Sequence, residues 1–268
     1  MRTRFPPSIA ARAVPCLAAA LAAAAGCSDS FELPQSIPTG ILTVVARSEG
    51  GQYVLTPEGV FLESTGMLTA DSRSTVDTCQ VGDLPTGGTA PNLDHLDAGD
   101  SIAFDLEGVT RYMKPVEQFG IITYVLSDPD VEFAPGDAFS FDLEGGPGFP
   151  AATIGSALAP VLTTLTPIPA SPPTDQPLVV SWTPVGDAGS RLEISLQYAL
   201  EGSVQPDEHI LCAWRDDGAG EIRGELLTGW AASGLRRIAV TRYRTERLEI
   251  GERVLFLLVT FDSVPPVQ

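Results

Sequence analysis

Short runs of alternating apolar and polar residues recur along this chain, each bounded by Gly, Pro or Asp. Period-two alternation gives a strand one apolar and one polar face, and the bounding residues favour turns. No segment in the first half has a sustained helical period, while 226–231 is predicted to form one or two helical turns. The chain is therefore predicted to be all-β. Its clearest strand candidates are 41–46, 53–56, 101–107, 121–126, 138–143, 178–183, 192–198, 210–214, 237–243 and 254–261.

A proline-rich segment divides these strand candidates into two groups. Residues 166–177 contain five prolines in twelve positions. Proline donates no backbone N–H to a sheet, so this segment is predicted to be a stiff linker. The sequence then predicts two β-sandwich domains in tandem, an acidic one at 40–165 and a second one at 178–268. Residues 254–261 are apolar on both faces and are predicted to form a central buried strand.

One internal similarity lies in the first group. Residues 99–108 and 136–145 agree at seven of ten positions, and each reads as turn, strand, turn. Alternation predicts one buried face in each copy, formed by Ile102, Phe104 and Leu106 in the first copy and by Phe139, Phe141 and Leu143 in the second. Two copies do not make a repeat array, so we interpret them as two uses of one favourable strand sequence.

The N-terminus reads as an export signal. Arg2, Arg4 and Arg12 precede an apolar stretch of twelve residues, 14–25, that ends in small side chains. A membrane-spanning helix needs about 20 apolar residues, so this stretch is too short to remain as an anchor. We therefore predict that residues 1–26 are a signal peptide, followed by a polar tether at 27–39.

The junction Ala24-Ala25-Gly26-Cys27 resembles the lipobox of bacterial lipoproteins, although Ala24 stands where the family prefers Leu. The resemblance implies that Cys27 is lipidated and becomes the new N-terminus, and Ser28 is similar to signals for the outer membrane. Several acyl chains would anchor the protein stably. The alternative is ordinary secretory cleavage, which would leave Cys27 as a free thiol.

Charge and cysteine content limit the partners and ligands. Of the 16 Lys and Arg, three lie in the predicted signal peptide, which leaves 13 against 34 acidic residues. This balance argues against a nucleic-acid partner. Beyond Cys27 only Cys79 and Cys212 remain, too few for a four-cysteine zinc site. In an oxidising compartment the two could form a disulfide; the alternative is two buried thiols.

Part of the second group resembles a known fold. Leu178–Pro184 and Leu192–Tyr198 resemble the second and third strands of a fibronectin type III domain, with Trp182 as the core tryptophan. This resemblance implies an immunoglobulin-like sandwich. The layout of the whole chain is similar to that of surface lipoproteins of G+C-rich Gram-negative bacteria, a similarity that implies no particular activity.

Catalytic and metal-binding motifs are absent from the sequence. The acids Asp128, Asp130 and Glu132 alternate in a way that could present oxygens to Ca²⁺, but solvated strand and turn chemistry explains them as well. His95 and His209 are expected to be exposed or locally paired rather than general bases. No catalytic residues and no cofactor are therefore predicted. A metal-dependent hydrolase is the weakest of the functional hypotheses.

Two further groups of residues suggest binding. Trp182, Trp214 and Trp230 could form a sugar-stacking platform, but core packing is favoured, because Trp182 alternates with Leu178 and Val180 on one face. Arg242 and Arg244 share one strand face and could bind carboxylates or phosphates, the alternative being pairing with interleaved glutamates. The sequence thus predicts an outer-membrane lipoprotein with a binding or structural ectodomain, whose partners are the membrane and an envelope protein or glycan.

Overall fold

The computed structural model describes residues 37–49, 52–64, 76–83, 94–118, 120–157, 165–186 and 189–263. The predicted signal peptide 1–26 and Cys27 lie outside these ranges, as does most of the predicted tether, so these assignments stay predictions. Among the described residues, no helix is long and apolar enough to cross a membrane.

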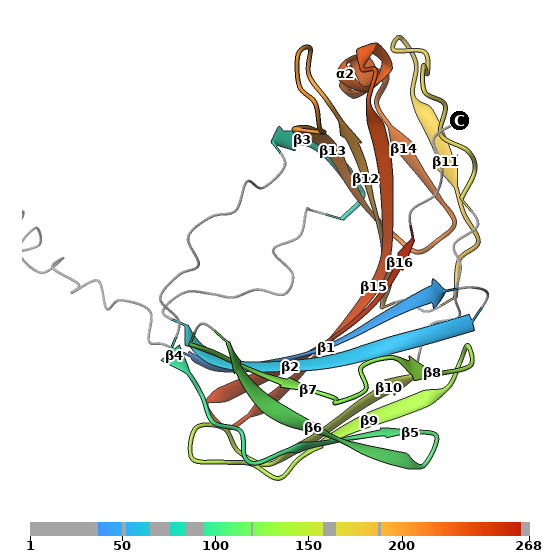
Figure 1. Cartoon of the computed structure of the whole chain (residues 1–268). Coiled ribbons are helices and arrows are strands. Elements are labelled where there is room, and N and C mark those ends of the chain that lie inside the picture. The colour runs from blue at the N-terminus through green and yellow to red at the C-terminus, as the bar shows by residue number, and fades with distance from the viewer. Residues whose placement is uncertain are drawn as a thin grey trace, which may run out of the picture. The chain divides into compact units, whose positions relative to one another are not determined.

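Strands make up most of the described chain, which confirms the predicted all-β fold (Figure 1). The predicted helical turns are present as a 3-10 turn at Gly224–Leu227 and helix α2 at Thr228–Ala232. The strands are β1 (Ile37–Glu49), β2 (Gln52–Ser64), β3 (Thr78–Asp83), β4 (Asp94–His95), β5 (Ile102–Leu106), β6 (Val109–Gln118), β7 (Ile121–Val125), β8 (Val131–Glu132), β9 (Ala138–Leu143), β10 (Ala152–Ala157), β11 (Leu178–Ser181), β12 (Ser190–Tyr198), β13 (Glu208–Arg215), β14 (Ala219–Ile222), β15 (Arg236–Ile250) and β16 (Arg253–Ser263).

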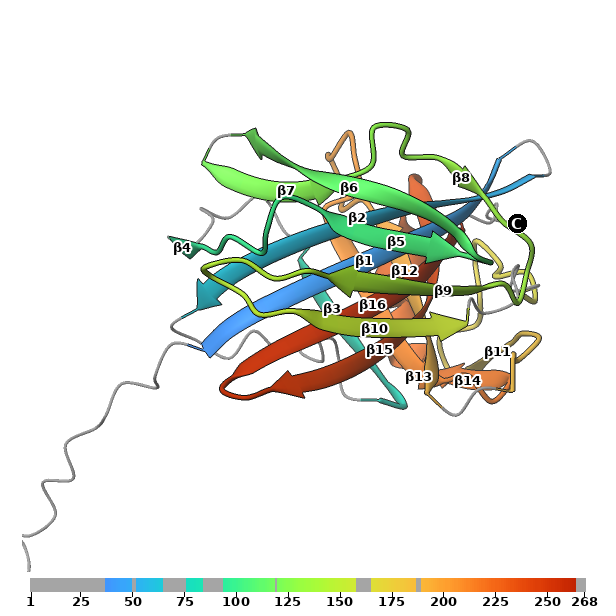
Figure 2. The same cartoon turned by 90° about the horizontal axis from the view of Figure 1, so that it is seen from below.

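Most of these strands belong to one hydrogen-bonded sheet of fourteen strands. Its order is β10-β9-β5-β6-β7-β2-β1-β16-β15-β12-β13-β3, with β4 and β8 also paired to β2. A second sheet contains only β11 and β14, and Figure 2 shows it beside the β13 end of the large sheet. β16 lies between β1 and β15, so the prediction of a central strand is correct. Its first part is buried on one side, because Leu255 and Leu257 are fully buried whereas Phe256 and Leu258 are half-buried; Val259, Thr260 and Phe261 are all buried.

Two strand pairings cross the proline-rich segment. β1 runs parallel to β16, with Leu42 opposite Leu257, and β3 pairs with β13, with Cys79 opposite Cys212. The predicted domains 40–165 and 178–268 therefore contribute to one sheet instead of each building its own. Ile37–Gln268 forms one compact unit. The number of domains within it stays a prediction.

The proline-rich segment itself packs against the body. Ile168 is only 1% exposed, and the indole Nε1 of Trp230 donates a hydrogen bond of 3.0 Å to the carbonyl of Pro169. The carbonyl oxygens of Thr174 and Gln176 approach Gly224 so closely that an added Cβ would lie 2.7 and 2.5 Å from them. Residues 166–177 thus contribute to a hydrophobic core, a role that the proline count did not predict.

Two hydrophobic cores occupy one face of the large sheet. Strand β15 connects them: its first part pairs with β12, and its second part pairs with β16. Directly opposed residues in a sheet point to the same face, and Arg242 of β15 lies opposite both Leu192 and Phe261. Leu192 belongs to the second core and Phe261 to the first. Arg242 therefore stands at the junction of the two cores.

The two similar segments of the sequence lie side by side. β5 and β9 pair antiparallel, with Phe104 directly opposite Phe141 and the ring centroids 5.1 Å apart. The predicted inward residues of both copies are buried, which confirms their orientation. At the ends, Gly99 approaches Gly145, where a Cβ on Gly99 would lie 2.9 Å from the Gly145 carbonyl oxygen at a positive φ of 109°. This close approach explains Gly99 and Gly145, whereas Gly108 and Gly136 have open space around the Cβ position and positive φ values of 80° and 91°.

Candidate functional site

A polar groove lies beside β6 in the described part of the chain. The first half of β6, 109–113, pairs with β5, whereas its second half, 114–118, pairs with β7. After Val125 the chain leaves β6 and continues along β2, where β8 pairs with Val54 and Leu55. The separation of β6 from residues 126–132 opens a groove of about 530 Å³.

Side chains of three kinds line this groove. Leu126 and Val131 are buried, and they form its apolar floor. Tyr112 is 57% exposed and supplies an aromatic ring. The polar lining consists of Arg111, Ser127, Asp128, Asp130 and Glu132. The groove therefore combines one exposed ring with hydrogen-bond donors and acceptors.

One of the three predicted calcium candidates has a partner of its own. Asp130 forms an ion pair of 2.6 Å with Arg47, whose Nη1 also donates to the hydroxyl of Thr56 at 2.9 Å. Asp128 and Glu132 are exposed on the groove. Within the described ranges, no group of three His, Cys, Asp or Glu side chains could hold a metal ion. The structure therefore does not gather Asp128, Asp130 and Glu132 into a metal site.

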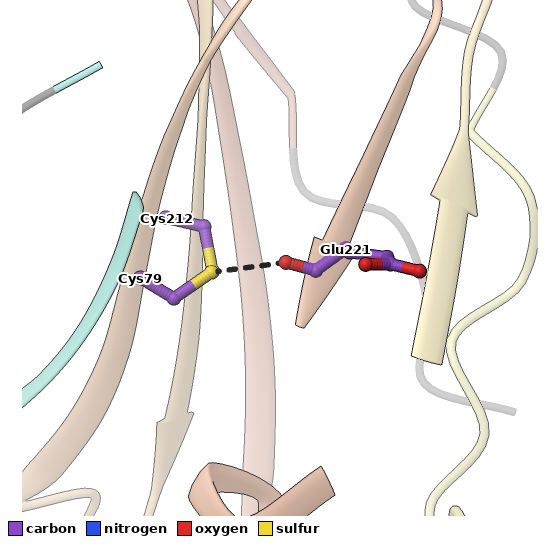
Figure 3. Close-up of a disulfide and its surroundings, with 3 residues drawn as sticks. All are labelled: Cys79, Cys212 and Glu221. Atoms are coloured by element: carbon purple, nitrogen blue, oxygen red, sulfur yellow. Dashed lines mark hydrogen bonds between the residues drawn. A yellow bond between two sulfur atoms is a disulfide. The ribbon is translucent and has the colours of Figure 1, made fainter. Parts of the chain in front are cut away.

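Cys79 and Cys212 form a disulfide across β3 and β13 (Figure 3). Their Cα atoms are 4.0 Å apart and 133 residues separate them in sequence. Cys212 is fully buried in the second core. The Cys79 sulfur also lies 3.7 Å from the carbonyl oxygen of Glu221 on β14, a contact rather than a hydrogen bond because an oxidised sulfur carries no proton.

An ion pair lies near the same pairing. The Nε of Arg215 at the end of β13 donates 2.9 Å to Asp77, the residue preceding β3, and the Asp77 amide donates 2.7 Å to the Ala213 carbonyl. The hydrogen bond from Arg215 holds the pKa of Asp77 below its ordinary value, and the same partner raises the pKa of Arg215. The disulfide and this ion pair both fix β3 to the sheet edge.

The predicted anion site at Arg242 and Arg244 is wrong for Arg242. Its side chain is 3% exposed, and its Nε lies 2.9 Å from Oδ2 of the buried Asp216. Its Nη2 donates to the carbonyl of Thr183 at 2.6 Å. Sequence alternation predicted the shared face correctly, but that face points into the protein. The guanidinium therefore binds an internal carboxylate instead of an external anion.

Arg244 pairs with a neighbouring glutamate, which is the alternative given above for these arginines. It forms an ion pair of 3.0 Å with Glu246, and Arg247 pairs with Glu249 at 2.9 Å. Interleaved glutamates thus neutralise these arginines along β15.

The tryptophans do not form a sugar-stacking platform. Trp182, Trp214 and Trp230 are 6%, 4% and 0% exposed. Trp182 stacks on Trp214 with ring centroids 5.7 Å apart, and its Nε1 donates 2.8 Å to Asp216. Core packing, the other interpretation of these residues, is therefore the correct one.

The two histidines lie on different strands. His95 is opposite Leu62 on the short β4, and His209 lies between Gln197 and Gly82 in the sheet. Both are half-buried. Neither lines the groove.

Sequence reasoning missed Tyr112 and Arg111. Residues 109–118 do alternate, with Tyr112 and Val116 on the face opposite that of the buried Met113, but Pro115 and the charged residues obscured the strand pattern.

No protein family model matches the chain, and no curated protein is significantly similar to it in sequence.

Proposed function

We propose that this protein is a lipid-anchored ectodomain of the bacterial outer membrane with a binding or structural role. The observation that carries the proposal is the disulfide between Cys79 and Cys212. Disulfides persist in oxidising compartments such as the periplasm and the cell surface, and are rare in the cytosol. The bond therefore supports export, in agreement with the signal-like residues 14–25 and the lipobox-like junction at Cys27.

The distance between Cys27 and the first strand suits an anchor. Residues 28–36 separate the cysteine from β1 at Ile37. Nine residues reach about 30 Å when fully extended, enough to hold a folded body clear of lipid headgroups. A binding role is supported by the groove at Tyr112, whose side chains suit ring stacking and hydrogen bonding.

Subcellular fractionation of two cysteine variants tests the anchor. Cys27→Ser is expected to move the protein from the membrane fraction to a soluble fraction, because the acylated sulfur would be lost. Cys16→Ser is the matched control, since Cys16 lies within the predicted signal peptide, and it should leave the protein in the membrane fraction. Sedimentation of the Cys27→Ser variant with membranes would overturn the proposal.

A further inference from the structure

The groove beside β6 contains polar groups that have no ion-pair partner among the described residues. Asp128 and Glu132 form no ion pair there, in contrast to Asp130, which binds Arg47. Arg111 makes one long contact of 3.4 Å with the carbonyl of Val109. A guanidinium carries five N–H donors and each carboxylate accepts several bonds, so most of this hydrogen-bonding capacity is available to a ligand in the groove.

The backbone of β6 adds further capacity. Alternate residues of a strand direct their N–H and C=O groups to opposite edges. Residues 109–113 pair with β5 on one edge, and no described strand pairs with their other edge, which faces 126–132. The groove therefore offers main-chain donors and acceptors as well as side-chain ones.

The groove carries charges of both signs, with an excess of one negative charge. Arg47 neutralises Asp130, which leaves the cation of Arg111 against the carboxylates of Asp128 and Glu132. The Arg111 guanidinium would repel a strongly basic ligand, and the two carboxylates would repel an acidic ligand. A neutral ligand rich in hydroxyl groups can donate to the carboxylates and accept from the guanidinium simultaneously.

We propose that this groove binds a neutral carbohydrate. The exposed ring of Tyr112 stacks on the apolar C–H face of a sugar, because the face of an aromatic ring is electron-rich and its surface apolar. Arg111, Asp128 and Glu132 hydrogen-bond the hydroxyl groups at the ring edge. The volume of about 530 Å³ falls within the roughly 300–1,000 Å³ typical of small-ligand sites. The open form of the groove suits one stretch of a longer glycan.

This inference is independent of the lipid anchor, because a protein without acylation would keep the groove. An extended basic peptide pairing with the free edge of β6 is the competing occupant. The Arg111 guanidinium in the groove disfavours a basic peptide, and the exposed Tyr112 ring favours the glycan.

The test is a glycan array probed with the full mature chain purified in detergent. The array carries neutral hexose and N-acetylhexosamine oligomers, uronic-acid oligomers and amino-sugar oligomers, with Lys- and Arg-rich peptides as comparison. We expect retention of at least one neutral oligomer. Tyr112→Ala should weaken that binding about tenfold or more, whereas Tyr112→Phe, which keeps the ring, should bind nearly as well as the parent.

Two acidic variants separate the groove from general surface charge. Glu132→Gln is expected to weaken binding severalfold, and Glu117→Gln is the matched control, because Glu117 is exposed on β6 outside the groove. Since Tyr112 is exposed, its variants should melt at the parental temperature. Three results would each overturn the inference: no neutral oligomer is retained, Tyr112→Ala binds as well as the parent, or the basic peptides are preferred.

Discussion

The Nε of Arg242 lies 2.9 Å from Oδ2 of Asp216, and both side chains are almost completely removed from solvent. The same carboxylate accepts a hydrogen bond from the Trp182 indole at 2.8 Å and one from the Val185 amide at 3.3 Å. A buried carboxylate needs such partners, because an unpaired charge in a low-dielectric interior is costly. This cluster ties the segment after β11 and the turn after β13 to β15, at the junction of the two cores.

Removing the cation should therefore destabilise the protein strongly. Arg242→Gln leaves Asp216 as a buried charge without its partner, which typically costs about 3–5 kcal/mol. Arg244→Gln is the matched control on the same strand face, and it should cost less than about 1 kcal/mol, since its pair with Glu246 is partly exposed. Urea unfolding followed by tryptophan fluorescence measures both. Equal midpoints for the two variants would contradict the buried role of Arg242.

Local patterns predicted the strands well because alternation is a property of each segment. The inward faces of β5 and β9 and the central position of β16 all follow from residues within those segments. Alternation fixes which residues share a face, but not what lies opposite that face. Arg242 and Arg244 were correctly placed together, yet the partner of Arg242 is 26 residues away in sequence. A fully buried arginine and a partly exposed one have the same local pattern.

Local sequence patterns could not predict which strands pair, for a related reason. The parallel pairing of β1 with β16 joins residues more than 200 positions apart, such as Leu42 and Leu257. Neither segment carries a signal for the other beyond general apolarity. The groove was missed for the same reason, since it arises where the chain leaves β6 after β7, and only the fold exposes Tyr112 there.

Loss of the disulfide is the second prediction. In the chain-entropy model, a link that closes a loop of more than 100 residues stabilises the folded state by about 4–5 kcal/mol. The double variant Cys79→Ala and Cys212→Ala should therefore unfold at markedly lower urea. Treating the parent protein with reductant should lower its midpoint similarly, while the double variant should not respond. A reductant response of equal size in both would show that the effect does not come from this bond.

Thiol titration gives an independent measurement of the same bond. The unfolded, unreduced protein should have no reactive thiol at Cys79 or Cys212, and Cys79→Ser should release one at Cys212. Reactive thiols at both Cys79 and Cys212 in the unreduced parent would contradict the disulfide.

The third prediction concerns Gly220 on β14. A Cβ built on this residue would lie 2.3 Å from the Trp214 ring, which stacks on Trp182. Gly220→Ala should therefore displace the two rings and cost about 1–3 kcal/mol, as overpacking of a core usually does. Gly234→Ala is the control, because nothing lies within 4 Å of its Cβ position. The near-ultraviolet circular dichroism of the tryptophans should change only in the first variant. An unchanged spectrum and midpoint for Gly220→Ala would contradict the packing.

The fourth prediction is a pH dependence at the edge strand β3. The hydrogen bond from Arg215 lowers the folded-state pKa of Asp77 below the ordinary value of 3.8. A carboxyl group whose pKa is lower in the folded state stabilises that state above its unfolded pKa, and this stabilisation disappears as the pH falls through the folded-state value. The stabilisation from Asp77 should thus be complete at neutral pH and lost progressively below about pH 3.8. Asp77→Asn should lower the melting temperature at pH 7.

The difference between Asp77→Asn and the parent should then shrink as the pH falls through the folded-state pKa of Asp77, below which both carry an uncharged side chain. Added salt at pH 7 should also reduce it, since the pair is exposed and is screened over roughly 10 Å at 0.1 M. Asp175→Asn is the control, because this exposed carboxylate forms no ion pair within the described chain. Its melting temperature should follow the parent at every pH. A difference for Asp77→Asn that persists unchanged at low pH would mean that Asp77 acts through its shape and not through its charge.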